Sequence, residues 1–324
     1  MYGYQTFHDG MMQTLIESVR SASSCNAYIF EGSEGLGKYE SARLFAAALT
    51  CSEQKRAPCG ACPSCIGAKA DTNPDIKTID TAGKKSIGVG QIREIIQDAY
   101  IRPFESVRKV YILRDGDALT EEAQNAFLKV LEEPPQYTVF IILVSKSSML
   151  LQTVLSRSCV LRFPPLSDSV MRNYIEKSYP DANADFLVRF SGGIPGRADA
   201  VMQQENFWEL REESFQKLIS LLSVQTVSAY SVADFLEEHK ENADLILEFW
   251  QGQLRDVLFL QSGAENLVTN TDQLSLLRRI AGRLSEEETV FTLETLDQSR
   301  EMLRRYVNLH AMAMFLSLRV KERK

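Results

Sequence analysis

The stretch of residues 32–38 limits the possible folds of this chain more than any other part of its sequence. Its sequence, GSEGLGK, matches the pattern G-x-x-x-x-G-K, with an apolar strand-like run before it and a helical pattern after it. A strand, a glycine-rich loop and a helix in this order form a phosphate cradle, because backbone N–H groups and the helix N-terminus face the anion while the lysine meets its outer charge. The motif therefore predicts a P-loop α/β domain, and its candidate nucleotide-binding residues are Gly32, Gly35, Gly37 and Lys38.

The residues that would coordinate a metal ion and activate a water molecule in such a site are unusual. Tyr39 stands where a short hydroxyl side chain normally reaches Mg²⁺, and its phenol oxygen lies too far out on a rigid ring to coordinate the ion. Asp115, at the end of the apolar run 109–115, is the candidate metal-side carboxylate, but Gly116 follows where a carboxylate would activate water. We expect the next carboxylate, Asp117, to point elsewhere. The sequence thus predicts that a magnesium nucleotide binds weakly or not at all and is not hydrolysed; the alternative is an active ATPase with one atypical motif.

Short apolar runs rich in β-branched residues alternate with helical patterns through the first half of the chain. Runs that are apolar on both faces, separated by helices, indicate a parallel sheet covered on both sides. The predicted strands are 27–31, 76–80, 109–115, 138–145 and 159–163, and the predicted helices are 38–49, 89–100, 120–132 and 148–156. After residue 205 only helical apolar spacing occurs, over 207–222, 231–260, 272–284 and 286–318.

These patterns divide the chain into three predicted domains. Residues 1–166 form the α/β domain, which ends at paired prolines. Residues 167–205 contain three short helical patterns around a glycine-rich turn, and residues 206–324 form a helical bundle.

Cysteine spacing predicts a metal site. Four of the six cysteines follow the spacing C-x7-C-x2-C-x2-C, and a two-residue gap lets both sulfurs of a turn face one ion. The candidate ligands of a structural zinc ion are Cys51, Cys59, Cys62 and Cys65, with two disulfides or four free thiols as the alternatives. Four thiolates leave no open coordination position, so the ion would hold a loop and catalyse nothing. Cys25 and Cys159 are predicted to be buried.

The charge of the chain argues against a free-standing nucleic-acid binder. Lys and Arg number 36 against 43 Asp and Glu, a net charge of −7, and the first 165 residues are balanced at 18 of each sign. The acidic excess therefore lies in the helical half, and no global positive field attracts a phosphate backbone. No apolar run approaches the roughly 18 residues of a membrane helix, and the first residues lack a signal-peptide pattern. We therefore expect a cytoplasmic protein.

One arginine is a further candidate for contact with a nucleotide. Arg157 follows the predicted helix 148–156, and its planar, permanently charged fork suits phosphate oxygens in a neighbouring subunit. Taken alone, a single exposed arginine more often forms a surface salt bridge. The sequence leaves both roles open at this point.

These residues, in this order, resemble the clamp-loader AAA+ proteins of bacterial replication. The resemblance covers roughly residues 5–205 and includes the P-loop, the four-cysteine insert, NPD at 73–75, KVYIL at 109–113, AFLKVLEEPP at 126–135 and LSR at 155–157. AFLKVLEEPP together with the cysteine insert is its most specific part. It implies a P-loop AAA+ domain with a parallel sheet, a small helical lid domain and a C-terminal all-α collar bundle for oligomerisation.

Within this family, the departures described above fit the delta-prime branch of DNA polymerase III subunits. The ATP-hydrolysing gamma/tau branch has Thr at position 39 and an Asp-Glu pair at 115–116, and this chain differs at both places. The resemblance then implies a non-hydrolysing subunit that helps load the sliding clamp on primed DNA, with Arg157 as an arginine finger for a neighbouring ATPase subunit. The alternative within the family is an ATP-hydrolysing gamma/tau-type subunit.

The resemblance also implies partners and two further site residues. The partners are gamma/tau and delta subunits in a hetero-oligomeric ring and, through that ring, the sliding clamp and primed DNA. Arg197 loosely matches the family's second-sensor position, where it is either a nucleotide contact or a helix-surface charge. Ser145 occupies the first-sensor position and is either a site residue or a strand cap.

Overall fold

The protein is described by a computed structural model covering residues 7–223 and 229–322. It divides into two compact units, which are described separately here. The first comprises Met1–Tyr174 with Ser191–Arg197, and the second comprises Ile175–Phe190 with Ala198–Lys324. The three-domain division at residues 166 and 205 stays a prediction.

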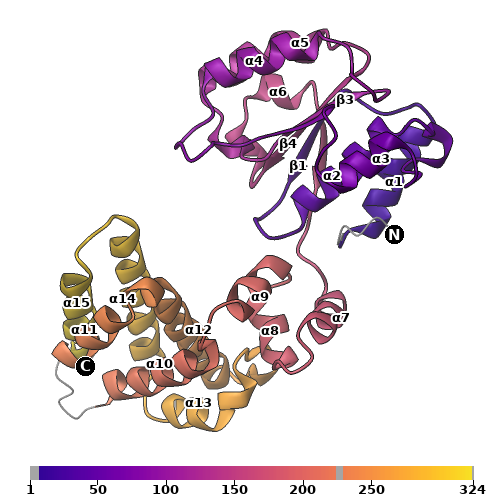
Figure 1. Ribbon diagram of the computed structural model, residues 1–324. Helices are drawn as coiled ribbons and strands as arrows, with labels where there is room; N and C mark the ends of the chain where they lie inside the picture. The colour runs from indigo at the N-terminus through magenta and orange to yellow at the C-terminus, as the bar shows by residue number, and fades with distance from the viewer. Residues whose placement is uncertain (1–6, 224–228, 323–324) are drawn as a thin grey trace. The chain divides into compact units, whose positions relative to one another are not determined.

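The first unit is built on a parallel five-stranded sheet (Figure 1). The strands are β1 (Ala27–Glu31), β2 (Ile76–Ile79), β3 (Lys109–Leu113), β4 (Thr138–Val144) and β5 (Cys159–Arg162). Their order in the sheet is β2-β3-β4-β1-β5, and every neighbouring pair is parallel. The predicted α/β fold with a parallel sheet is therefore confirmed.

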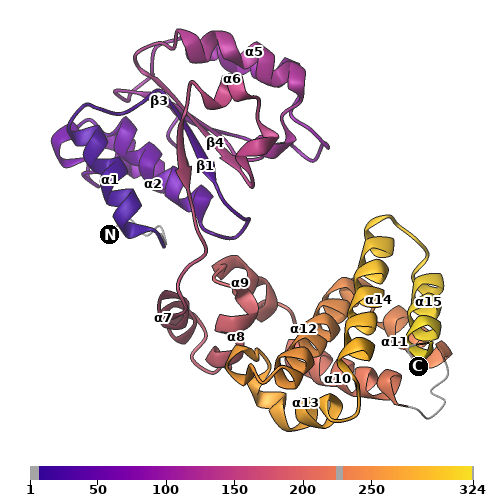
Figure 2. The ribbon, with the colours of Figure 1, turned by 180° about the vertical axis from the view of Figure 1, so that it is seen from behind.

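Helices cover both faces of this sheet, as Figure 2 also shows from behind. One face packs against α1 (Asp9–Arg20), α2 (Lys38–Thr50) and α3 (Pro63–Lys69), and the other against α4 (Val89–Ala99), α5 (Glu121–Glu132) and α6 (Gln152–Leu155). Successive strand residues alternate between the two cores: Tyr28 and Phe30 face the first group of helices, and Ala27 and Ile29 face the second. Short 3-10 turns lie at η1 (Gln54–Arg56), η2 (Gly116–Ala118) and η3 (Ser147–Met149).

The ends of α5 are fixed by local sequence. The Thr120 side chain accepts a hydrogen bond from the Ala123 N–H over 3.2 Å, and Glu121 and Glu122 occupy the first turn, where the helix dipole favours acidic residues. The helix ends at Glu132, two residues before Pro134, because a proline disfavours helical backbone before it. This places the Glu132 side chain at the C-terminal end of α5.

The remaining part of the chain is helical. Its helices are α7 (Asp168–Ser178), α8 (Ala184–Ser191), α9 (Pro195–Met202), α10 (Phe207–Leu222), α11 (Ala229–Glu238), α12 (Ala243–Gln261), α13 (Leu274–Ala281), α14 (Glu286–Arg304) and α15 (Leu309–Lys321). From α10 onward, a single apolar core runs through these helices, with Phe215, Trp250 and Leu316 fully buried in it. Across residues 7–223 and 229–322, none of the helices combines the length and apolarity needed to cross a bilayer.

Two long helical patterns are interrupted, which corrects the sequence prediction. The range 231–260 contains α11 and α12 with the 3-10 turn η4 (Lys240–Asn242) between them, and 286–318 contains α14 and α15. The second break occurs where the Asn308 side chain accepts a hydrogen bond from the Ala311 N–H over 3.1 Å and starts a new helix. Apolar spacing continues through both breaks, because each pair of helices packs on the same core.

The prediction that Cys25 and Cys159 are buried was wrong. Cys25 is exposed, since it lies in the polar turn that leads into β1, and Cys159 is half-buried. Cys159 begins β5, which is an edge strand of the sheet and is covered less completely than the central strands.

Candidate functional site

The glycine-rich loop lies at the carboxyl end of β1, which has β4 and β5 as its neighbours in the sheet. Gly35 has a φ of +83°, a left-handed conformation that glycine adopts without strain. α2 begins at Lys38, directly after the loop, so the free N–H groups of its first turn point toward the loop. The sequence GSEGLGK thus builds the strand, loop and helix arrangement of a phosphate cradle.

The lysine of this loop is held by the loop itself. The Lys38 ammonium group donates hydrogen bonds to the carbonyl oxygens of Gly32 and Ser33, the second over 2.8 Å. Burial lowers the pKa of Lys38, and the negative charges of Asp117 and Glu34 oppose that shift. The charge that would meet a phosphate is therefore already directed at two backbone carbonyls.

The segment Ser191–Arg197 of the first unit lies against the loop. The Gly196 N–H donates to the Gly35 carbonyl over 2.9 Å, and a Cβ atom at Gly196 would lie 2.6 Å from the Gly35 Cα. Arg197 follows in the first turn of α9 and is half-buried. The structure thus brings Arg197 close to the P-loop in space.

Arg114 is a site residue that sequence reasoning missed. β3 ends at Leu113, so Arg114 is the first residue beyond the strand, and its guanidinium carbon lies 4.8 Å from the centroid of the Tyr39 ring. The Tyr39 hydroxyl is 3.3 Å from the hydroxyl of Thr78, at the end of its ring away from the loop. The signal was available in the sequence, because the apolar run KVYIL ends one residue before Arg114.

The two aspartates after β3 point in different directions. An Asp115 carboxylate oxygen accepts a hydrogen bond from the Thr81 N–H over 3.0 Å, beyond the end of β2. An Asp117 oxygen accepts from the Ser145 N–H over 2.7 Å, and its charge acts on Lys38. Asp117 thus faces the backbone of Ser145, whereas Asp115 contacts Thr81, and the expectation that Asp117 does not replace the carboxylate missing at position 116 stays a prediction.

Gly116 occupies a position where the surrounding packing leaves no room for a side chain. A Cβ atom there would lie 2.6 Å from the Ile142 Cγ2 and 2.6 Å from the Leu143 carbonyl oxygen. We therefore expect Gly116→Ala to lower the free energy of unfolding by about 1–3 kcal/mol through overpacking. Chemical denaturation measures this change. Gly90→Ala in α4 is the matched control, because a Cβ atom there has nothing within 4 Å. Equal stability of the two variants would contradict the prediction.

Arg157 lies in the turn between α6 and β5. Its Nη1 group donates to the Thr153 carbonyl over 3.0 Å and to the Ser156 hydroxyl over 3.2 Å. Its Nη2 atom lies 2.7 Å from a Glu132 carboxylate oxygen. The side chain retains 35% of its exposure, so the guanidinium group is accessible from solvent.

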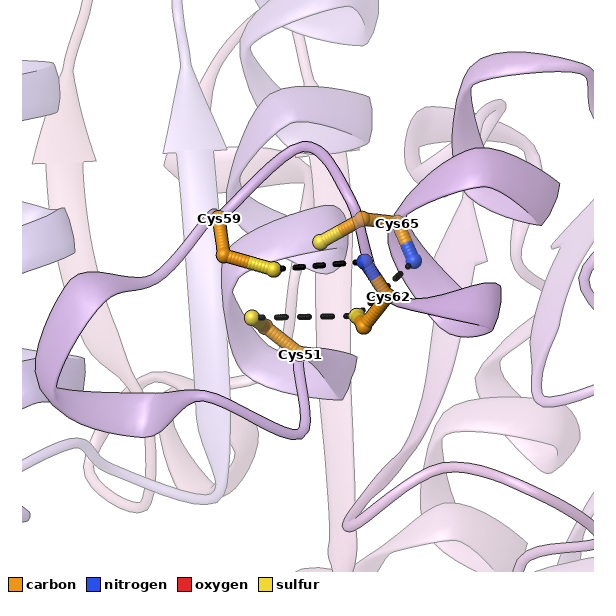
Figure 3. A group of neighbouring side chains, drawn as sticks. All are labelled: Cys51, Cys59, Cys62 and Cys65. Atoms are coloured by element: carbon orange, nitrogen blue, oxygen red, sulfur yellow. Dashed lines mark hydrogen bonds between the residues drawn. The ribbon is translucent and has the colours of Figure 1, made fainter.

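The four predicted zinc ligands form a cluster. Cys51 follows α2, Cys59 lies in the loop before α3, and Cys62 and Cys65 lie at the start of α3, with their side chains facing one another (Figure 3). All four sulfur atoms lie within 4.8 Å of one another, and the Cys51 and Cys62 sulfurs are 4.0 Å apart. Tetrahedral ligands at about 2.3 Å from zinc are about 3.8 Å apart. The cluster therefore fits a zinc ion after a small contraction.

Backbone N–H groups prepare part of this cluster for the thiolate form. The Cys62 sulfur accepts from the Cys65 N–H, and the Cys59 sulfur accepts from the Cys62 N–H, both over 3.4 Å. Burial opposes ionisation of Cys62, but hydrogen bonds from Ser52 and Cys65 outweigh it and lower the pKa of Cys62 to about 6. Burial raises the pKa of Cys51. A cation would favour the thiolate at every position, since metal ligands must be deprotonated.

Comparisons with known proteins point to one family. Residues 7–167 match the family described as "DNA polymerase III, delta subunit", and residues 205–314 match "DNA polymerase III, delta subunit, C terminal". The chain is 26% identical over 320 residues to DNA polymerase III subunit delta' of Bacillus subtilis (strain 168), covering 96% of this chain and 95% of the relative. It is 30% identical over 297 residues to subunit delta' of Escherichia coli (strain K12), covering 90% and 86%.

A second kind of relative matches a shorter region. The DNA polymerase III subunit gamma/tau of Mycobacterium tuberculosis (strain ATCC 25618 / H37Rv) is 30% identical over 187 residues. That match covers 55% of this chain and 32% of the relative. The delta' relatives are therefore matched over nearly their whole length, and this gamma/tau relative over about a third.

Proposed function

The chain belongs to the family of DNA polymerase III delta' subunits, and from this premise we propose that it is a non-hydrolysing subunit of the clamp loader that places the sliding clamp on primed DNA. Its proposed partners are the gamma/tau and delta subunits of a hetero-oligomeric ring in the cytoplasm. The helices of residues 206–324 are the proposed oligomerisation collar, and residues 167–205 the proposed lid.

The contact between Arg114 and Tyr39 is the observation that best supports the lack of hydrolysis. Mg²⁺ takes oxygen ligands, but the Tyr39 hydroxyl lies beside Thr78, and the permanently charged guanidinium group of Arg114 lies over the Tyr39 ring. A divalent cation placed there would be repelled by Arg114, and the phenol of Tyr39 is turned toward Thr78. With a phenol at position 39 and no carboxylate at position 116, the nucleotide site of this subunit is proposed to be idle.

A melting experiment on the isolated full-length chain tests this part of the proposal. We expect no rise in the melting temperature with millimolar Mg²⁺-ATP and no release of phosphate with primed DNA present. A ligand at a hundredfold excess over its Kd would add about 2.7 kcal/mol to the stability of the folded state. A rise in melting temperature together with turnover, both abolished by Lys38→Ala, would identify the gamma/tau-type ATPase instead.

Arg157 is proposed to act in trans as an arginine finger. It lies on an accessible turn of the first unit, and its guanidinium group can donate hydrogen bonds to two phosphate oxygens at once. Because the P-loop of the same subunit is proposed to be idle, Arg157 would act on the nucleotide bound by a neighbouring gamma/tau subunit.

The four-cysteine cluster is proposed to hold a structural zinc ion. The ligand set Cys51, Cys59, Cys62 and Cys65 is complete, and the mutual distances of its sulfurs support one tetrahedral ion. The ion would tie the end of α2 to the start of α3, with no position open to a substrate.

A further inference from the structure

The arginine proposed as the finger is oriented by groups of its own subunit. Nη1 donates to the Thr153 carbonyl of α6 and to the Ser156 hydroxyl at the start of the turn. The Nη2 atom instead reaches a different element, the Glu132 carboxylate at the end of α5. α5 and α6 lie side by side on one face of the sheet, so this ion pair joins the end of α5 to the turn that follows α6 (Figure 1).

Glu132 occupies an unfavourable position for its own helix. It is the last residue of α5, and the negative end of a helix dipole destabilises a carboxylate placed there. Lys129, in the same turn, has the sign of charge that a helix C-terminus favours. Helix stability therefore does not account for an acidic residue at position 132, whereas the ion pair with Arg157 does.

We propose that Glu132 is a positioning residue for Arg157. Its carboxylate, acting with the Thr153 carbonyl and the Ser156 hydroxyl, fixes the guanidinium plane before a partner's nucleotide arrives. Nη1 bonds to Thr153 and Ser156, and one N–H of Nη2 faces Glu132, which leaves Nε–H and the second N–H of Nη2 for phosphate oxygens of that nucleotide. This inference rests on the proposed function, because it requires Arg157 to act in trans.

Two physical points support an orienting role. An arginine has many rotamers, and fixing it in advance removes part of the ordering cost from the step in which it meets the transferring phosphate. The ion pair is also weak, because the Glu132 side chain retains 50% of its exposure and such exposed ion pairs contribute little free energy. The pair therefore orients the guanidinium group without holding it so tightly that it cannot adjust to a phosphate.

The test uses the clamp-loader ring assembled from full-length subunits, with ATP as substrate. We expect Glu132→Gln to lower kcat for ATP roughly two- to tenfold at unchanged KM, because the ordering of one side chain is lost in the transition state. Glu132→Asp keeps the charge and is expected to restore most of the rate. Glu133→Gln removes a neighbouring exposed carboxylate and is the matched control, with kcat unchanged.

Each outcome decides between positioning and its alternatives. An unchanged kcat in Glu132→Gln, alongside a collapse in Arg157→Ala, would overturn this inference and leave the arginine finger standing. A higher kcat would show that Glu132 competes with the phosphate, which also overturns it. A rise in KM alone, or a melting temperature lowered more than in Glu133→Gln, would assign Glu132 a structural role. If Arg157→Ala itself leaves turnover unchanged, the arginine finger fails and the positioning role fails with it.

Discussion

Replacing Arg157 by alanine is expected to lower ATP turnover of the assembled clamp loader by about 10³-fold or more, with ring assembly unchanged. An arginine supplied in trans stabilises the charge that develops on the transferring phosphoryl group, and effects of this size are typical of such residues. Steady-state phosphate release by the ring measures the loss. Size-exclusion chromatography of the same sample shows whether the ring has formed.

Two variants make the interpretation of this loss specific. Arg157→Lys retains the charge but not the planar fork, so its rate should remain well below that of the unchanged ring. Arg162→Ala removes another exposed arginine of the same unit, which lies 3.4 Å from Glu31, and should leave the rate unchanged. If Arg157→Ala rings turned over ATP at the normal rate, Arg157 would be only a partner for Glu132.

The sheet of the first unit was predictable because its strands are continuous apolar runs of β-branched and aromatic residues. Such runs have a single interpretation once helices separate them. All five predicted strands are present, and the differences are one or two residues at their C-terminal ends. The two residues beyond β3 have different partners: the Arg114 guanidinium lies over the Tyr39 ring, whereas Asp115 accepts a hydrogen bond from the Thr81 N–H.

Contacts between elements that are distant in the sequence could not be predicted from local sequence patterns. The pairing of Glu132 with Arg157 depends on how α5 packs beside α6, and the crowding at Gly116 depends on β4. Both contacts become visible only once the helices are packed on the folded sheet. The cysteine cluster was predictable, because its three later members are spaced closely enough that a single turn of chain brings them together.

Removing the proposed zinc ion is expected to have the largest effect on stability. Structural zinc sites contribute about 10–16 kcal/mol of apparent binding free energy in small zinc peptides, and that free energy is coupled to folding. In this protein Cys51, Cys62 and Cys65 belong to the same buried core as Phe45 of α2, so loss of the ion would loosen a large part of that face. We expect one zinc ion per chain by elemental analysis, and a fall of several degrees in the melting temperature for Cys62→Ser.

Cys25→Ser is the matched control for the zinc experiment. Cys25 is a cysteine of the same unit that is exposed and lies outside the cluster, so its replacement should change neither the zinc content nor the melting temperature. A native protein that contains no zinc, in which all six thiols react with a thiol reagent, would contradict the site. Equal melting temperatures for Cys62→Ser and Cys25→Ser would contradict its structural role.

The effect of zinc removal should extend beyond the cysteines along one path of hydrogen bonds. Ser64, between two of the ligands, accepts a hydrogen bond from the Asn73 side chain over 2.9 Å, and the Ser106 hydroxyl lies 3.1 Å from it. The buried Asp75 accepts N–H bonds from Phe104, Glu105 and Ser106, and those bonds hold the loop that exposes the Phe104 ring. Faster amide exchange at 104–106 in Cys62→Ser than in Cys25→Ser is therefore expected, because a displaced α3 removes one support of that loop. Exchange that changes only around 51–65 would show that Asp75 holds the loop alone.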